Sequence, residues 1–237
     1  MTAHRPGRVS RRPPDLRSEG PVRIFPGMSE RPDPRARVRV RKVSSGKRRG
    51  ASEGGLAGQL LISMPGMRDP RFERAVVFLC EHSEKGTMGL VVNKPSRDVT
   101  FPELAQHLEV ELPEDPGTVD VHVGGPVEPG RGFVLHSAEY DRAGATLRVG
   151  SRFGMTATID VLREIAEGAG PDRALLALGY AGWSAGQLES ELAANCWLTA
   201  EATLDLVFDR APEEKWGAAL GALGVDPTGL SAEAGRA

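Results

Sequence analysis

Three short apolar segments with strand-like patterns open the part of the chain that is rich in large apolar side chains. The first, Leu60–Ile62, is ended by Pro65 and Pro70, because proline cannot extend a hydrogen-bonded ladder and forces the preceding residue out of the helical region. The second, 75–82, is apolar on both alternating faces, which predicts a strand buried on both sides. A short glycine-containing loop leads to the third, 88–93, so we expect the last two to form a hairpin.

Strand patterns and helical spacings follow each other irregularly in the rest of the chain. Thr100 with Glu103, and Ser184 with Gln187, have the spacing of a capping box and predict helix starts. Further strands are expected at 121–123, 131–136, 146–149, 175–179 and 195–198, and further helices at 159–166 and from Pro212 onward. This order predicts an α+β fold, a single domain over 55–230 with a mixed or antiparallel β-sheet.

Charge divides the chain into two unlike parts. Residues 1–50 carry 15 Lys and Arg against 4 Asp and Glu, a charge of +11, whereas the remaining residues sum to −13. Residues 1–54 have few large apolar side chains, which predicts a disordered basic tail. A start codon chosen upstream of Met28, an organellar transit peptide and a nucleic-acid-binding arm are the alternatives for this tail. Residues 231–237 are expected to be a frayed C-terminus.

Cysteine content and hydropathy suggest a cytoplasmic protein. Only Cys80 and Cys196 occur, so a disulfide framework is not expected and a reducing compartment is the default. The longest apolar run is far shorter than the roughly 18 residues that a membrane span requires, and no secretory h-region precedes the folded part. We expect no contact with a membrane. We also expect no metal and no cofactor, because the donor residues do not fall into a ligand spacing.

Three groups of residues contain side chains that are common in active sites, but a purely structural role explains each group better. Cys80 and His82 are two residues apart on one strand, so a thiol–imidazole contact is conceivable, but a packed cysteine and a strand-end histidine are expected. A hydrolytic set drawn from Asp120, His122, His136 and Ser137 lacks a nucleophile elbow. The glycines before Pro126 lack the order of a phosphate-binding loop, which favours a tight turn.

The most suggestive polar cluster is a glycine-flanked aromatic turn, a polar helix face and a returning strand. Ser63 and Asn93, at strand ends elsewhere, could meet this cluster and line a mostly apolar pocket with a few oriented polar atoms. Helix capping and core aromatics are the alternative explanation of the same residues. The candidate binding residues are Ser63, Asn93, Tyr180, Trp183, Gln187, Glu189, Asn195 and Trp197, with Glu191 on the same helix.

An ordered set of motifs resembles the bacterial YqgE/AlgH family over roughly residues 55–224. Its segments are Leu61-Ile62-Ser63-Met64-Pro65 with Phe72, Gly89 to Pro95, Gly124-Gly125-Pro126-Val127, Gly132 to His136, Gly179 to Trp183, and Asn195-Cys196-Trp197. The resemblance implies a bifurcated, partly barrel-like sheet surrounded by helices. Members of that family have been labelled regulators of transcription or of alginate production, without an established biochemical activity. The long basic tail departs from the family pattern.

Three classes of function follow from these observations. The leading hypothesis is a non-catalytic binding module with a regulatory role, whose partner is a small molecule or a protein. The alternative is a hydrolase or thiol enzyme. The third is a DNA-associated regulator, which the charge of −13 outside the tail opposes. Any contact with nucleic acid is therefore expected through the basic segment Arg35–Arg49.

Overall fold

The computed structural model of the protein describes residues 55–226. The predicted tail 1–54 and the predicted frayed end 231–237 lie outside the described residues. The strands are β1 Gln59–Ser63, β2 Val76–Ser83, β3 Gly86–Val91, β4 Asp120–Val123, β5 Val127–Ser137, β6 Thr146–Val149, β7 Phe153–Thr156, β8 Ala174–Ser184 and β9 Trp197–Glu201. The helices are α1 Phe101–His107, α2 Ile159–Ala166, α3 Gln187–Ala193 and α4 Pro212–Ala222, with a 3-10 turn η1 Pro70–Phe72 and a π-helix η2 Asp205–Asp209.

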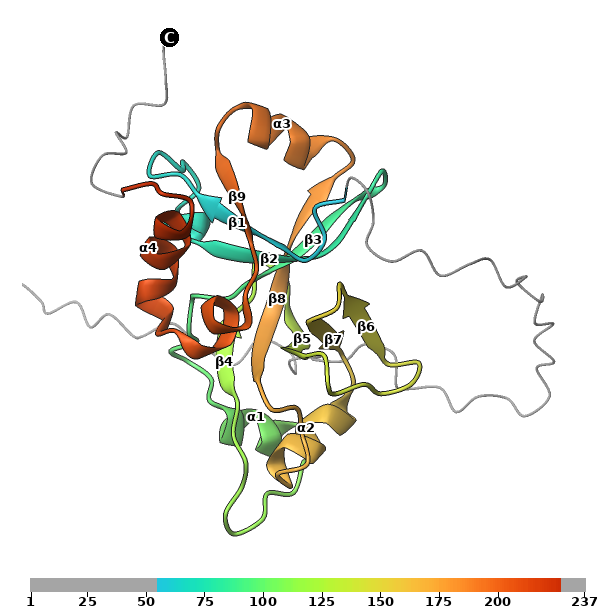
Figure 1. The fold of residues 1–237 in the computed structure, drawn as a ribbon. Helices are drawn as coiled ribbons and strands as arrows, with labels where there is room; N and C mark the ends of the chain where they lie inside the picture. Colours follow the sequence, from blue (N-terminus) through green and yellow to red (C-terminus); the bar gives the residue numbers. More distant parts are fainter. Residues whose placement is uncertain (1–54, 227–237) are drawn as a thin grey trace, which may run out of the picture.

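Strand β8 is the axis on which the sheet divides. Its first half pairs with β4 in parallel and with β5 antiparallel, whereas its second half pairs antiparallel with β3. The full order is β6-β7-β5-β8-β3-β2-β1-β9, with β4 attached to β8 outside this path. In Figure 1 β8 runs through the centre of the molecule, from α2 at one end to α3 at the other. The sheet is therefore mixed and bifurcated, within a single α+β domain.

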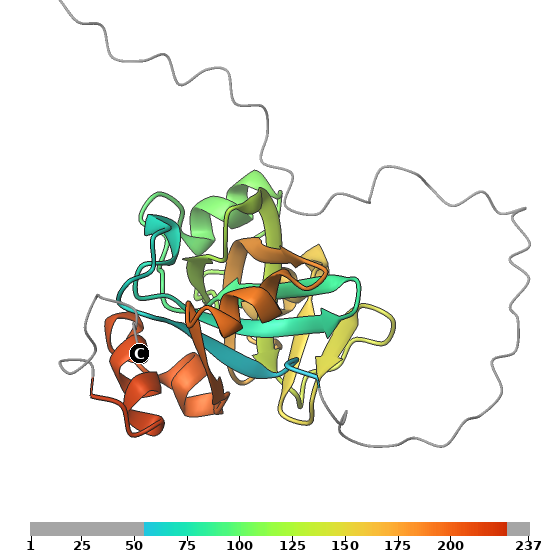
Figure 2. The same ribbon diagram turned by 90° about the horizontal axis from the view of Figure 1, so that it is seen from above.

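The two ends of the sheet curl toward each other and form an incomplete barrel. The Arg152 guanidinium, in the turn between β6 and β7, lies 2.6 Å from the Glu201 carboxylate at the end of β9. Between these ends, the Phe78 and Phe153 rings pack with their centroids 4.7 Å apart. Seen from above, the strands enclose this interior while α4 and η2 close one side of it (Figure 2).

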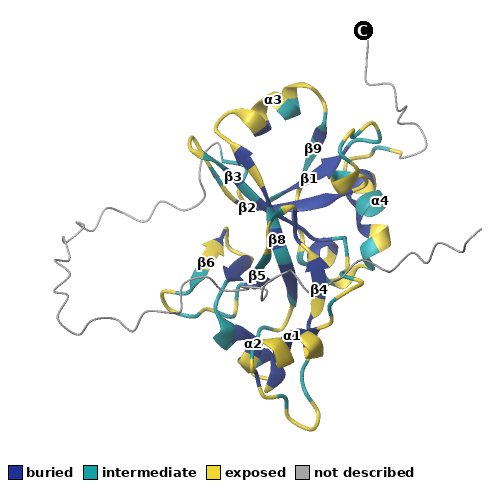
Figure 3. Cartoon of the chain, turned by 180° about the vertical axis from the view of Figure 1, so that it is seen from behind, coloured by how far each residue is buried: buried dark blue, intermediate teal, exposed yellow. Residues whose placement is uncertain are grey.

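Helices cover both faces of the sheet, because each face carries apolar side chains that need a partner. The interior of the half barrel packs against η2 and α4 through Val207 and Leu220. On the opposite face, α1 and α2 cover the half of β8 that pairs with β4, and α3 covers the other half through Leu188. Figure 3 shows the strands mostly buried and the outer helix faces exposed.

Most of the predicted helices and strands are present. The differences occur where contacts between distant parts of the chain determine the secondary structure. Strand β7 was not predicted, and β8 continues through the glycine-flanked aromatic turn instead of ending before it. Helix α4 buries Lys215, and Leu223, just after the end of this helix, is exposed. The π-helix η2 was also not predicted.

At Gly124-Gly125-Pro126, where a tight turn was expected, the backbone passes very close to the backbone of β8. A Cβ on Gly124 would lie 2.3 Å from the Gly179 carbonyl oxygen, and one on Gly125 would lie 2.1 Å from the Tyr180 carbonyl carbon. Glycine is needed because these distances leave no space for a side chain. The contact fixes the point at which the chain leaves β4 and crosses β8.

Candidate functional site

Part of the predicted binding set converges on one carboxylate. The indole N–H groups of Trp183 and Trp197 both donate to Glu191 Oε2, over 2.9 and 2.8 Å, and Gln187 Nε2 donates to Glu191 Oε1 over 2.9 Å. Phe72 packs against both indoles, with ring centroids 6.5 and 5.6 Å away. Both tryptophans are nearly fully buried. These contacts hold α3 against the end of the sheet.

Ser63 and Asn93 anchor the loop between β1 and β2. Asn93 Oδ1 accepts from the Val76 N–H over 2.8 Å, and its Nδ2 donates to the Arg74 carbonyl over 2.8 Å. Ser63 Oγ accepts from the Ala75 N–H over 2.8 Å. Both side chains thus satisfy backbone groups of the same loop, and Ser63 also lies directly opposite Trp197 in the pairing of β1 with β9.

The other predicted residues are separate from that cluster. Tyr180 packs edge-on against Phe133, and its hydroxyl donates to Glu128 over 3.4 Å. Asn195 is exposed, with a φ of 54° just after the end of α3. Glu189 projects from α3 and lies 3.5 Å from His82 Nε2. The structure therefore joins Trp183, Gln187 and Trp197 through Glu191, with Ser63 opposite Trp197 on the neighbouring strand. The side chains of Asn93, Tyr180, Glu189 and Asn195 make none of these contacts.

Cys80 and His82 lie on opposite faces of the sheet. The register of β2 and β3 shifts between Leu79 and Glu81, which is a β-bulge, so the alternation of faces changes there. Cys80 packs in the half-barrel core, whereas His82 Nδ1 is 2.8 Å from Thr87 Oγ1 on the other face. Burial raises the pKa of the Cys80 thiol, and the Glu81 charge adds to this. Cys80 is thus a packed, neutral thiol.

The residues considered for a hydrolytic set do not assemble into one. His136 is fully buried, and its ring nitrogens are 2.9 Å from the Ser137 carbonyl oxygen and 3.0 Å from Thr156 Oγ1. The Ser137 hydroxyl instead donates to Glu139 over 2.7 Å. Asp120 and His122 project from β4 and make no hydrogen bond to either residue.

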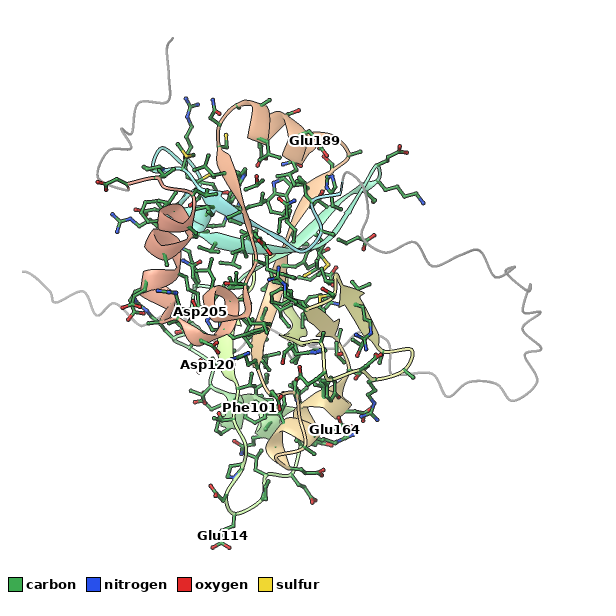
Figure 4. The ribbon with its side chains drawn as sticks, viewed as in Figure 1. Phe101, Glu114, Asp120, Glu164, Glu189 and Asp205 are labelled. Carbon is green, nitrogen blue, oxygen red and sulfur yellow. The ribbon has the colours of Figure 1, made fainter. Side chains whose placement is uncertain are left out.

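A cavity of about 370 Å³ opens beside β4. Its wall consists of residues 117–120 at the start of β4, Gly168 and residues 170–174 leading into β8, Ile165 of α2, and Phe208 and Asp209 of η2. The volume is at the lower end of the range for small-molecule sites. Figure 4 shows Asp120 and Asp205 on the facing elements β4 and η2, far from Glu189 on α3. The cavity is therefore a different location from the Glu191 cluster.

The charged side chains of this wall are three aspartates and one arginine. They are Asp120, Asp172, Asp209 and Arg173, so the formal charge is −2. Arg173 Nε donates to Asp209 over 2.9 Å. In the described chain, the Asp120 carboxylate accepts no hydrogen bond and forms no ion pair within 4 Å. One carboxylate of the cavity is therefore free of direct partners.

Two buried basic groups lie next to Asp120. Lys215 is 2% exposed, and its Nζ donates to the Val92 carbonyl over 3.0 Å and to the Val207 carbonyl over 2.6 Å. Burial lowers the pKa of Lys215 to about 8, against the opposing effect of the Asp120 and Asp209 charges. Perturbed ionisable groups beside a cavity are a physical indicator of a functional site.

His122 follows Asp120 on the same face of β4 and is also 2% exposed. Neither of its ring nitrogens has a partner at hydrogen-bonding geometry in residues 55–226. Burial first and the Lys215 ammonium second lower the pKa of His122, and the Asp120 backbone and carboxylate oppose this shift. An unpartnered buried imidazole is unusual in a native core.

Sequence reasoning did not select Lys215 or Asp209. Lys215 is in an expected helix, four residues before the buried Ala219, and this spacing is the only local signal that it points inward. Asp209 is in the π-helix, which local pattern does not predict. Asp120 and His122 were considered only as members of a hydrolytic set.

Comparison with known proteins identifies the family. A model of the family described as AlgH-like (DUF179) matches residues 60–228. The chain is 56% identical over 183 residues to a UPF0301 protein of Jannaschia sp., which covers 77% of this chain and 95% of the relative. It is 52% identical over 182 residues to a UPF0301 protein of Cereibacter sphaeroides, covering 77% and 99%. The chain belongs to the AlgH-like family.

Solved structures agree with this assignment. The solution structure of the AlgH protein from Pseudomonas aeruginosa is 44% identical, with a TM-score of 0.64, and covers 80% of this chain and all of that one. A crystal structure of a protein from Corynebacterium diphtheriae, 23% identical with a TM-score of 0.56 over 70% of this chain and 86% of that one, shows the shared fold alone. The resemblance to the YqgE/AlgH family is thus confirmed.

Two further observations concern residues 55–226 of this AlgH-like chain. No helix there is long and apolar enough to cross a membrane. Within the same residues, no group of three or more His, Cys, Asp or Glu side chains has an arrangement that could hold a metal ion.

Proposed function

We propose that this AlgH-like protein is a non-catalytic binding module with a regulatory role in the cytoplasm, and that the cavity beside β4 is its ligand site. The observation that supports this most is the free Asp120 carboxylate at a cavity backed by two buried basic groups, Lys215 and His122. Buried charge is costly to maintain, and fold stability alone does not require it. A small polar ligand is the class of partner that fits.

The surface around α3, which carries Gln187 and Glu189, is the second proposed location for the binding site. It contains the part of the sequence-predicted set that is exposed, next to the aromatic cluster of Trp183 and Trp197. The two locations are separate in the molecule and can be tested independently (Figure 4).

A thermal-shift panel of small cations, anions and neutral polar compounds tests the proposal. We expect at least one chemical class to raise the melting temperature, with the matching mass shift in native mass spectrometry. Thr118→Trp, which places a large side chain from an exposed position into the cavity, should abolish this effect, whereas Glu189→Ala should not. Loss in Glu189→Ala alone would move the site to α3, and no stabilisation by any class would overturn the small-molecule module.

A hydrolase is the second candidate function, and one arrangement supports it. His82 lies between Thr87 Oγ1 at 2.8 Å and Glu189 Oε1 at 3.5 Å, which is the order hydroxyl, imidazole, carboxylate. Thr87 is 7% exposed, so its hydroxyl is poorly placed for attack. A fluorophosphonate probe tests this alternative, because covalent labelling at Thr87 that Thr87→Val removes would favour a hydrolase over a binding module.

A further inference from the structure

We propose that the cavity takes a small organic cation, whose ammonium or guanidinium group pairs with Asp120 and Asp209, and that this cation displaces a proton from Lys215. The proposal deepens the proposed function and rests on it. It concerns the ligand class and a coupling between the ligand and a buried side chain.

The first argument is the charge of the cavity. Three carboxylates and one guanidinium line it, and Arg173 is paired with Asp209. Asp120 has no direct partner, and a carboxylate in a concave site attracts cations and excludes anions. The His122 imidazole, on the same face of β4 as Asp120 but behind the cavity wall, has no partner at full hydrogen-bonding geometry in residues 55–226. A cation at Asp120 would complete the charge pairing that the protein leaves open.

The second argument is the hydrogen bonding of Lys215. A lysine ammonium has three N–H donors, whereas the neutral amine has two. Lys215 Nζ has two carbonyl acceptors, Val92 and Val207. Both N–H groups of the neutral amine would therefore donate to backbone carbonyls. The third N–H of the ammonium has no acceptor there, so only the nearby negative charges favour keeping this proton.

The carboxylates that favour the protonated form of Lys215 are the same carboxylates with which a bound cation would pair. Asp120 of β4 and Asp209 of η2 raise the pKa of Lys215 against the effect of burial. The neighbouring His122 would oppose them if it were protonated, but its own pKa is lowered. A ligand cation at these carboxylates neutralises them and adds a positive charge nearby. The proton then leaves Lys215 for solvent, and the nitrogen keeps its lone pair.

Calorimetry of the full chain tests both parts of the proposal. Agmatine and putrescine serve as cationic probes, and glutarate as an anionic probe of similar length. Titration at pH 8 in two buffers of different ionisation enthalpy gives the number of protons released. We expect the cations to bind, with release of up to about half a proton each at a pH near the pKa of Lys215.

Variants then assign the effect to residues. Asp120→Asn and Asp209→Asn should each weaken agmatine binding about tenfold, the size of one charge-assisted contact. Glu201→Gln, which neutralises an exposed carboxylate outside the cavity, should leave binding unchanged. Lys215→Met should abolish the proton release. If this variant does not fold, the release by the full-length native protein must still be largest at or just below pH 8 and fall toward pH 9, where Lys215 is already neutral without ligand.

The outcomes separate the two proposals. Binding of glutarate without binding of the cations, blocked by Thr118→Trp, would overturn this inference and leave the binding module standing. Cation binding without proton release, or with a release that Lys215→Met retains, would overturn the coupling. Failure of every probe class in the thermal-shift panel would overturn the proposed function itself.

Discussion

Trp183 and Trp197 share a single carboxylate oxygen. Trp183 is on β8 and Trp197 on β9, at opposite ends of the segment that carries α3, and both indoles donate to Glu191 Oε2. The rings meet edge to face, with centroids 5.9 Å apart. One side chain of α3 therefore fixes the positions of both strands that flank it.

Replacing Glu191 should destabilise the protein strongly. Glu191→Ala leaves two buried indole N–H groups without an acceptor, which we expect to lower the free energy of unfolding by about 2–4 kcal/mol. Glu191→Gln keeps one acceptor oxygen and should cost less. Urea denaturation followed by tryptophan fluorescence measures both, with Glu189→Gln as the exposed control. Equal stabilities of Glu191→Ala and the control would contradict the structural role of this carboxylate.

The two buried histidines should respond oppositely to substitution. His136 has partners for both ring nitrogens, so His136→Leu should lower the free energy of unfolding by about 1–3 kcal/mol. His122 has none, so His122→Leu should be neutral or stabilising by about 1 kcal/mol at pH 7. Chemical denaturation of the pair checks this. A large loss of stability in His122→Leu would show that the imidazole has a partner, such as water.

The same histidines should contribute to acid sensitivity. Burial lowers the pKa of both below the usual 6.5, so the unfolded state binds protons that the folded state does not. Stability must therefore fall as the pH drops below about 6.5 and is fully present above it. The slope of unfolding free energy against pH between 7 and 5 should be smaller in His122→Leu than in the native chain.

Lys215 should make the protein more stable at alkaline pH. Its pKa is lowered from 10.5 to about 8 in the folded state, so between these values the unfolded chain binds the additional proton. The free energy of unfolding should rise across this window, by about 3 kcal/mol for this group. Lys215→Met should lose that rise, whereas Lys85→Met in the exposed β2–β3 hairpin should keep it. Parallel pH profiles of native protein and Lys215→Met would contradict the shift.

The two cysteines should differ in reactivity. Burial raises the pKa of the Cys80 thiol, and thiolate is the reactive form, so Cys80 should react with a disulfide reagent only after unfolding. Cys196 is partly exposed and should account for the reaction of the native protein. Cys196→Ser should then be unreactive until denatured. Labelling of native Cys80 faster than a free thiol would support the alternative of a thiol enzyme.

The local sequence pattern was sufficient to predict many helices and strands. It failed where a contact between distant residues determines the conformation. The capping box of Thr100 and Glu103 is formed as expected, because its partners are three residues apart. The prediction that Cys80 and His82 share one face of the sheet was wrong, because a bulge in β2 reverses the alternation of faces after Leu79. A bulge depends on the partner strand β3, which the pattern of β2 alone does not contain.

The sequence by itself determined the fold class, the family and most of the strands and helices, since these depend on periodicity, turn residues and ordered motifs. It also supplied Trp183, Gln187 and Trp197 as a set, because they lie within one short segment. Tertiary structure alone decided that Asp120 and Asp209 line one cavity and that Lys215 is buried beside them. These residues are far apart in the chain, and only the packing of η2 and α4 onto β4 gives them a common environment.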